Sequence, residues 1–293
     1  MSGWSWTSAA DDSGVVLRLP GPRAAADAVA RPSAVNAGQA RSLARRGGVR
    51  WLGVETVKEA DEVLSGARAW TEGLDAFKEA LGACEGSMAA MTLPTTRRRR
   101  RYGEDGGELD ADRLYAGALD VAWRRCERVR GNAPRAVRLV VDVCGHCGEV
   151  AGDMVWPGAA AVALGERLSA AGRRVEVEAV FLTAGFLGAG GAGLVSCVVK
   201  ASHEPWDQRR ALAWAAFPGA FRGRLMRAAY SCGSRVSRGM GAPIHNASRF
   251  AAMTGEELKG VIFVPALRDA TAAAAFCKRA LVEAGATTGG CDD

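Results

Sequence analysis

The feature that most constrains the fold is an apolar strand followed at once by a small polar turn. Residues 136–143 read Ala-Val-Arg-Leu-Val-Val-Asp-Val, which is β-branched and almost continuously apolar. Such a run is typical of a strand that is buried on both faces of a sheet. The turn Cys144-Gly145-His146-Cys147 follows it directly. The run therefore predicts an interior strand of an α/β domain, with the turn at the carboxyl end of that strand.

The segments after this strand alternate between helical and extended patterns. The expected helices are 158–171, 206–230 with a break at Pro218, and 269–284, and the expected strands are 174–182, 193–200 and 260–265. Strand, helix and strand in this order predict a right-handed βαβ unit. We therefore expect an α/β fold, in which a mostly parallel, Rossmann-like sheet is flanked by helices.

Two other regions precede this α/β domain, which we assign to residues 133–293. Residues 1–35 are rich in Ser, Ala, Asp, Gly and Pro and show no sustained periodicity, which predicts an extended arm. Residues 36–132 predict a mainly helical N-terminal region, because apolar residues recur there at helical spacing. The expected helices of that region are 36–46, two within 54–84, and 110–130.

Positive charge is the main clue to a nucleic-acid partner. The 293 residues carry a formal net charge of +6, with a sequence pI near 9.0, which favours contact with an anionic surface. The candidate nucleic-acid-binding residues are Arg97, Arg98, Arg99, Arg100, Arg101, Arg235, Arg238 and Arg249, the last three in a loop at 231–249. Acidic residues between 104 and 112 would neutralise the arginine run locally, so a solvated loop is the alternative interpretation.

Cysteine usage and hydropathy indicate the compartment. The eight cysteines are scattered, and the N-terminus lacks the basic start and apolar stretch of a secretory signal, so reduced thiols and a cytoplasmic location are expected. Uninterrupted apolar runs of about 18 residues are absent from the sequence. We therefore expect no membrane span and no membrane partner.

The Cys-Gly-His-Cys turn has a redox interpretation. It resembles the active-site tetrapeptide of the protein disulfide isomerase and thioredoxin family, which would make Cys144 the nucleophile and Cys147 the resolving thiol. The sequence departs from that family, because Val143 replaces the usual aromatic residue and no later cis-proline pair is present. A thiol-disulfide oxidoreductase is therefore an alternative function. The simplest alternative is that both cysteines are small, partly buried side chains.

The same turn has two metal interpretations. Cys144, His146 and Cys147 could bind Zn²⁺ with a fourth ligand from elsewhere, although the second ligand pair of a structural zinc site is missing. Asp142, Cys144 and His146 also occupy the Asp-x-Ser-x-Ser positions of von Willebrand factor A (vWA) domains, which the sequence resembles here. In that family an aspartate and two hydroxyls hold Mg²⁺. Thiol and imidazole replace those hydroxyls poorly, so the resemblance implies a degenerate metal-dependent adhesion site.

A wider resemblance involves residues 139–180. Their strand, polar turn, Trp156-Pro-Gly-Ala-Ala-Ala161 helix and Gly172-x-x-Val-Glu-Val177 strand are similar to a set of uncharacterised, largely bacteriophage-encoded proteins. Further similarity lies in Trp70–Gly73, Gly106–Asp110 and Phe217–Arg222. The resemblance implies a vWA-like core and a phage or prophage context, in a bacterial cytoplasm or in a virion.

Together these patterns lead to one expected function and two alternatives. We expect a non-enzymatic protein-interaction or assembly module with a protein partner and no cofactor, whose only metal candidates are Mg²⁺ and Zn²⁺. The alternatives are the oxidoreductase that uses Cys144 and Cys147, and a nucleic-acid-binding protein that uses the arginines at 97–101 and the 231–249 loop.

Overall fold

The structure is a computed structural model that describes most of the chain. The described residues are 5–10, 14–31, 42, 45, 47–94, 98–103, 108–128, 136–145, 149–185, 191–234 and 241–288. Within them, no helix is long and apolar enough to cross a membrane.

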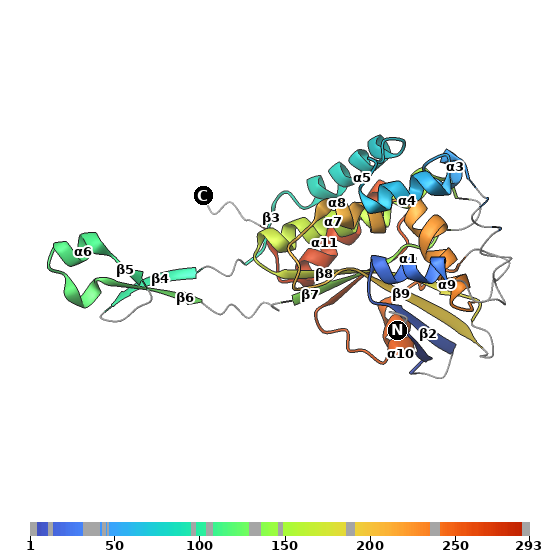
Figure 1. The fold of residues 1–293 in the computed structure, drawn as a ribbon. Helices are drawn as coiled ribbons and strands as arrows, with labels where there is room; N and C mark the ends of the chain where they lie inside the picture. The colour runs from blue at the N-terminus through green and yellow to red at the C-terminus, as the bar shows by residue number, and fades with distance from the viewer. Residues whose placement is uncertain are drawn as a thin grey trace.

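A six-stranded sheet forms the centre of the molecule (Figure 1). Its strands are β1 (Ser5–Ser8), β2 (Gly14–Leu19), β7 (Ala136–Asp142), β8 (Arg174–Thr183), β9 (Ala192–Lys200) and β10 (Val261–Val264). They are arranged in the order β1-β2-β9-β8-β7-β10. The pairs β2–β9, β7–β8 and β7–β10 are parallel, while β1–β2 and β8–β9 are antiparallel. The prediction of an α/β fold with a mostly parallel sheet is thus confirmed.

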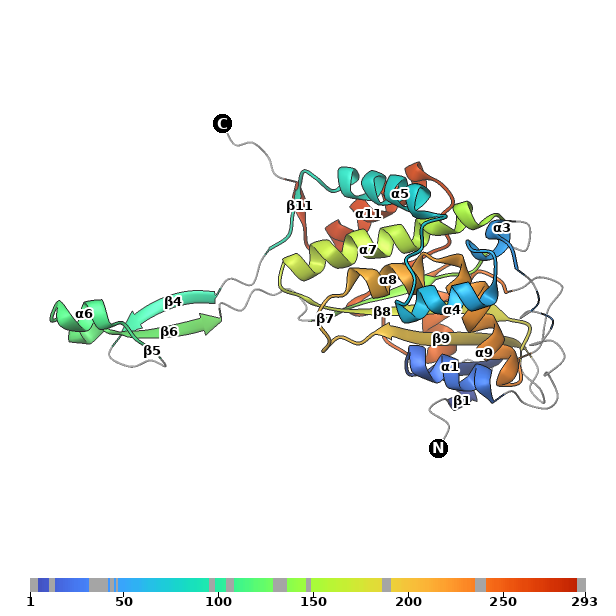
Figure 2. The ribbon, with the colours of Figure 1, turned by 45° about the horizontal axis from the view of Figure 1, so that its top comes forward.

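Most helices cover one face of this sheet, and a single helix covers the other (Figures 1 and 2). The first group comprises α1 (Pro22–Ala30), α4 (Val57–Ser65), α5 (Leu74–Ser87), α7 (Val155–Ala170), α8 (Gln208–Ala215), α9 (Met226–Ser231) and α11 (Ala270–Glu283). The second face packs against α10 (Ala247–Thr254). Strand alternation separates the two cores: Leu139 and Val141 face the larger one, whereas Val140 faces α10.

Helix α7 is the central element of the larger core. It follows a 3₁₀ turn, η2 (Ala151–Met154), and starts at Val155, three residues before the expected helix. Pro157 is tolerated there because a proline in the first turn of a helix loses no intrahelical hydrogen bond. The helix is apolar on every side and buried along most of its length, since α5, α8 and α11 pack around it.

Short elements complete the fold. They are α3 (Val49–Leu52), the π-helical segment η3 (Ala220–Leu225), and the strands β3 (Met91–Thr92) and β11 (Thr287–Thr288), which pair with each other. The sequence-based helix at 36–46 lies almost entirely outside the described residues.

The predicted extended arm at 1–35 is wrong where the structure describes that segment. Residues 14–19 form β2, which pairs with β9 in the middle of the sheet, and Pro22–Ala30 form α1. The sequence Gly-Val-Val-Leu-Arg-Leu is a short apolar strand whose partner lies about 180 residues further along the chain. The N-terminal strands therefore belong to the same sheet as strands from the second half of the chain.

The predicted helix at 110–130 is also wrong over most of its length. A short helix, α6 (Ala111–Tyr115), starts at the N-cap Asp110, and Gly117 follows with a φ of 77°, a left-handed conformation that suits glycine. The turn η1 (Leu119–Val121) and a strand, β6 (Trp123–Arg128), come next. The arginine run, for which a solvated loop was the alternative interpretation, supplies most of β4 (Arg98–Gly103).

These segments form a separate three-stranded sheet, which we call the ribbon (residues 98–103 and 108–128). Its order is β4-β6-β5, with β5 at Glu108–Leu109, and both pairings are antiparallel. Figures 1 and 2 show the ribbon standing away from the central sheet, beside the amino end of β7. The region assigned as mainly helical thus divides into the helices α3, α4 and α5, which pack on the core, and this projecting sheet.

Candidate functional site

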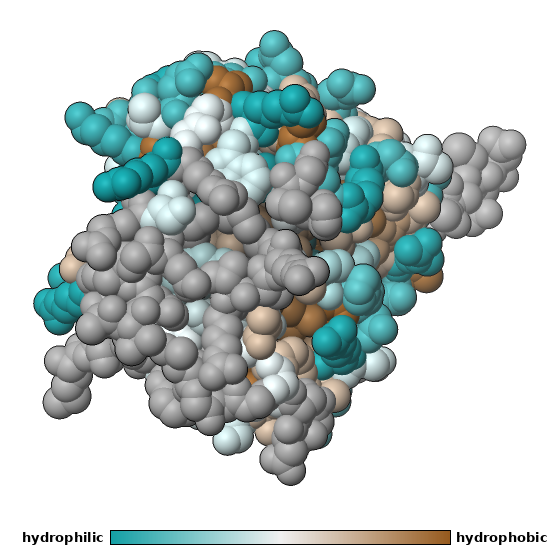
Figure 3. Space-filling model, turned by 90° about the vertical axis from the view of Figure 1, so that its right-hand side faces the viewer, coloured by the Kyte–Doolittle hydropathy of each residue, from teal (hydrophilic) through white to brown (hydrophobic). Residues whose placement is uncertain are grey.

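The turn after β7 lies where the strand order of the sheet reverses. From β7 the chain proceeds to β8 and β9 on one side, and β10 then pairs with the other side of β7. This arrangement is the 3-2-1-4 order of doubly wound sheets, in which ligands bind in the crevice at the carboxyl ends of the strands. Figure 3 views the molecule from that end, where hydrophilic side chains (teal) alternate with smaller apolar areas (brown).

Asp142 connects the two loops that border this crevice. Its side chain is fully buried, and its carboxylate accepts two backbone hydrogen bonds, from the Cys144 N–H at 3.0 Å and from the Ile244 N–H at 2.8 Å. The first bond closes the turn after β7, and the second fixes the segment that leads into α10. Asp142 therefore holds together two backbone segments that are about a hundred residues apart in the chain.

This arrangement makes the stability of the fold depend on pH. Burial raises the pKa of Asp142 from 3.8 to about 7, against the effect of the two N–H donors. Between these two pKa values the folded state keeps a proton that the unfolded chain releases. The contribution of Asp142 to the free energy of unfolding is therefore full below pH 3.8 and is lost as the pH rises to about 7.

We predict that Asp142→Asn removes this dependence. The difference in the free energy of unfolding between the wild type and the variant should fall by a few kcal/mol between pH 4 and 7, because each unit of pKa shift corresponds to about 1.4 kcal/mol. Urea unfolding of both proteins at about pH 4.5 and about pH 7.5 measures this difference. A difference that stays constant across this range would contradict the prediction.

Cys144 is a buried thiol beside this carboxylate. Burial raises its pKa well above the ordinary value, the charge of Asp142 raises it further, and Arg222 and Arg268 act in the opposite direction. Among the neighbours of Cys144 is Gly241, where an added Cβ would lie 3.4 Å from the Cys144 Sγ. A thiol in this environment stays protonated and is a poor nucleophile.

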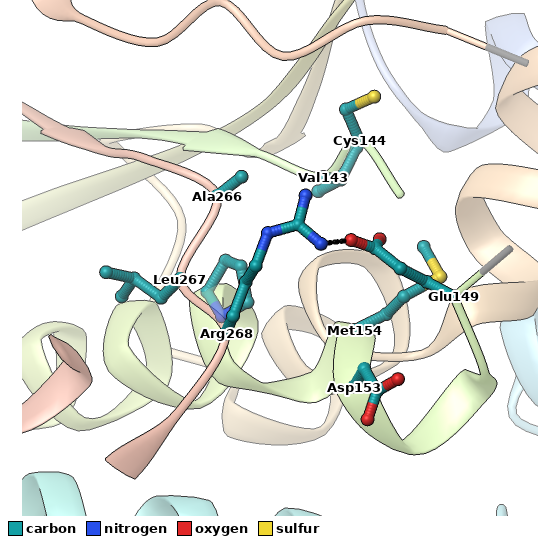
Figure 4. A pocket seen from close by; sticks show the side chains of 9 residues that line it. Val143, Cys144, Glu149, Asp153, Met154, Ala266, Leu267 and Arg268 are labelled. Atoms are coloured by element: carbon teal, nitrogen blue, oxygen red, sulfur yellow. Dashed lines mark ion pairs between the residues drawn. The ribbon is translucent and has the colours of Figure 1, made fainter. Parts of the chain in front are cut away.

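The crevice itself is almost filled by side chains (Figure 4). Its cavity has a volume of about 10 Å³, which is room for roughly one water molecule. An ion pair between Glu149 and Arg268 crosses it, between the segment that follows the turn and the segment that follows β10. Val143, Met154 and Leu267 form apolar parts of its wall. The described residues thus leave no space for a small-molecule substrate at this position.

The metal and redox candidates are only partly described by the structure. Asp142 and Cys144 lie together, whereas His146 and Cys147 are outside the described residues. In the described part of the chain, no group of three or more His, Cys, Asp or Glu residues is arranged to hold a metal ion.

The arginine candidates are divided between two parts of the molecule. Arg98–Arg101 form β4 in the ribbon, while Arg249 is exposed on α10 in the core. Arg97, Arg235 and Arg238 lie outside the described residues. The structure therefore does not bring the described arginines of the two predicted clusters together.

Two groups of residues were missed by the sequence analysis. The first is the set of arginines in β6, which pairs with β4 so that Arg98 is opposite Arg128 and Arg101 is opposite Arg125. The helical spacing of Leu114, Ala118 and Val121 concealed this strand.

The second missed group is a partly buried ion-pair network on the α10 face of the sheet, in which Glu178 is fully buried. Arg138 pairs with Glu178 and Glu256, Glu256 also pairs with Arg18 at 2.7 Å, and the Ser196 hydroxyl donates to Glu178. Burial raises the pKa of Glu178, while Arg138 opposes the rise. Charged residues inside the apolar strands β7 and β8 were the available signal. The network fastens the segment after α10 to the sheet.

Comparison with known proteins gives one match. No curated protein and no solved structure is significantly similar to this chain. The family model described as "Domain of unknown function (DUF7192)" matches residues 7–288, which includes the ribbon and every strand of the central sheet except the first residues of β1. The chain therefore belongs to the DUF7192 family.

Proposed function

We propose that this chain is a non-enzymatic protein-interaction or assembly module. The α/β core acts as a rigid scaffold, and the ribbon is the element that contacts the partner. The core is vWA-like, its adhesion site is degenerate, and the protein belongs to a phage or prophage and acts in a bacterial cytoplasm or in a virion. The resemblance of residues 139–180 supports this context.

The observation that carries the proposal is the surface of the ribbon. Leu109, Tyr115 and Trp123 have 42%, 87% and 37% of their surface exposed, and they are half of the exposed large apolar residues in the described part of the chain. Large apolar side chains that are grouped on a projecting element typically mark an interaction site. Aromatic residues together with arginines are also the residues enriched at the centres of protein interfaces.

The crevice at the carboxyl end of β7 supports the non-enzymatic part of the proposal. Its volume of about 10 Å³ is far below the several hundred Å³ of typical ligand pockets. Each carboxylate oxygen of Asp142 already accepts a backbone N–H, so this aspartate has a structural task that needs no metal. Together these contacts favour a scaffold over a catalyst at this position.

The two alternative functions receive less support from the geometry. Thiol-disulfide exchange needs a low pKa and access to solvent, and Cys144 has neither. Nucleic-acid binding would use the arginines of β4 and β6. Between residues 98 and 128, however, eight arginines are accompanied by seven acidic residues, so this stretch of sequence has a formal net charge of only +1.

We predict that the ribbon can be removed without loss of the core. Positions 98 and 128 are opposite each other in the β4–β6 ladder, so a short Gly-Ser linker can replace residues 98–128. We expect an unchanged melting temperature for the core and the loss of partner binding, measured by calorimetry and by the mass of the native assembly. An assembly of unchanged composition without the ribbon would contradict the proposed function.

A further inference from the structure

The charges of the ribbon are separated along its length. Its base, residues 98–101 and 124–128, contains seven arginines and one acid, Glu127. Glu108 is opposite Arg124 and so lies beside the base. The tip, residues 109–120, contains the three acids Asp110, Asp112 and Asp120 and one arginine. The base with Glu108 therefore carries a formal charge of +5, and the tip carries −2.

The positive charge within the tip is already engaged inside the ribbon. The Arg113 guanidinium lies 3.7 Å from the centre of the Tyr102 ring and 3.7 Å from the Asp110 carboxylate. Asp112 and Asp120, in contrast, are exposed. The tip therefore presents negative charge to an approaching partner.

The apolar residues connect these two charged regions. In the register, Leu109 is opposite Trp123, and directly opposed residues lie on the same face of a ladder. In the β4–β6 ladder, Arg101 is opposite Arg125, two positions towards the base from Gly103 and Trp123. In this register the apolar pair therefore lies between the basic base and the acidic tip.

We propose that two copies of the chain associate through their ribbons, which lie side by side and head to tail. The acidic tip of each copy meets the basic base of the other, and Leu109 and Trp123 of both copies are covered between them. This inference rests on the proposed function, because it names the partner of the same surface.

Charge and symmetry favour this partner over others. A twofold axis makes each copy offer the same surface, so a surface with one basic end and one acidic end is complementary to itself when reversed. A strand of six residues such as β4 spans about 20 Å, so the tip of one ribbon can reach the base of a second ribbon that lies alongside it in the opposite direction. A nucleic acid would be attracted by the base and repelled by the tip.

Reversal of the charges tests the arrangement on the full-length chain. One variant carries Arg98→Glu, Arg101→Glu, Arg125→Glu and Arg128→Glu, which make the net charge of the base negative, and another carries Asp112→Lys and Asp120→Lys, which make the net charge of the tip positive. Light scattering after size-exclusion chromatography gives the mass of each. We expect a dimeric wild type, weakened by salt, and a dissociation constant about tenfold or more higher for either variant alone.

A mixture of the two variants provides the decisive result. Reversed base and reversed tip attract each other, so the mixture should regain the dimer. The matched control carries Arg209→Glu, Lys259→Glu, Lys278→Glu and Arg279→Glu, because these four exposed residues lie on the core and their change of charge is the same as in the base variant. The control should remain dimeric, and circular dichroism should show that every variant is folded.

Three outcomes would overturn the inference. They are a monomeric wild type, variants that dimerise as the wild type does, and a mixture that stays monomeric. A dimer that disappears after nuclease treatment would assign the base to nucleic acid instead. If the wild type is monomeric but loses a different protein partner when the ribbon is excised, the inference fails while the proposed function stands.

Discussion

Replacing Gly158 by alanine is expected to destabilise the core by about 3 kcal/mol. Gly158 lies in α7 where this helix crosses the end of α8, and an added Cβ would be 2.3 Å from the Ala216 Cα and 2.4 Å from the Ala215 carbonyl oxygen. Both contacts involve backbone, so no side-chain rotation can relieve them and the helices must separate. Urea unfolding followed by circular dichroism measures the loss.

Gly82→Ala is the matched control for this substitution. Gly82 is also inside a helix, α5, but it is exposed and nothing lies within 4 Å of an added Cβ. Alanine should therefore stabilise the protein by up to about 1 kcal/mol through helix propensity. If both substitutions changed the free energy of unfolding alike, the close contact between α7 and α8 would be refuted.

Arg222→Ala should cost a similar amount, about 3 kcal/mol, for a different reason. Only 1% of Arg222 is exposed, and its guanidinium donates to the carbonyls of Trp51 and Glu149 at 3.0 Å each. It also stacks on the Trp51 ring at 4.0 Å. Truncation leaves two carbonyls without this donor and opens a cavity between η3 and α3.

Arg210→Ala serves as the control for the loss of an arginine. Arg210 forms an ion pair with Glu204 at 3.2 Å, but 34% of its side chain is exposed. Such pairs are screened by water, so the expected cost is below about 1 kcal/mol. Thermal unfolding of both variants distinguishes the two sites, and equal shifts in melting temperature would contradict the structural role of Arg222.

The parts of the fold that sequence predicts well are those with local signals. The structure places β7, α7 and β8 within a few residues of their predicted positions. The reason is that an apolar run, an alanine-rich helix and a β-branched strand follow one another in the sequence, and each has a clear local pattern. Strand β10 and helix α11 are placed equally well. Each of these elements is recognised from its own residues, without knowledge of its partner.

The parts that sequence misses depend on distant partners. Strand β2 is an interior strand of the sheet because it pairs with β9 as well as with β1. Strand β9 runs antiparallel to β8, and no periodicity in the sequence reveals this direction. Asp142 is placed correctly at the end of β7, yet its bond to Ile244 spans 102 residues of sequence. Local patterns carry no information on such contacts.

The ribbon shows how a local pattern can mislead. Apolar residues at helical spacing favoured one helix over 110–130, but Gly117 ends α6 early and the next residues find a sheet partner in the arginine run. The charge of that run was noticed from the sequence, whereas its pairing with a second arginine-rich strand was not. This pairing is what turns an apparent solvated loop into a candidate interface.

The central claim is that the ribbon, rather than the crevice, meets the partner of this protein. A photo-cross-linking residue at position 115, where Tyr115 is 87% exposed, tests it most directly inside cells. The same residue at position 282 is the control, because Val282 is 57% exposed on α11 in the core. Mass spectrometry identifies the products. We expect covalent adducts with protein from position 115 and none from position 282. Equal yields from both positions, or no adduct from position 115, would contradict the claim.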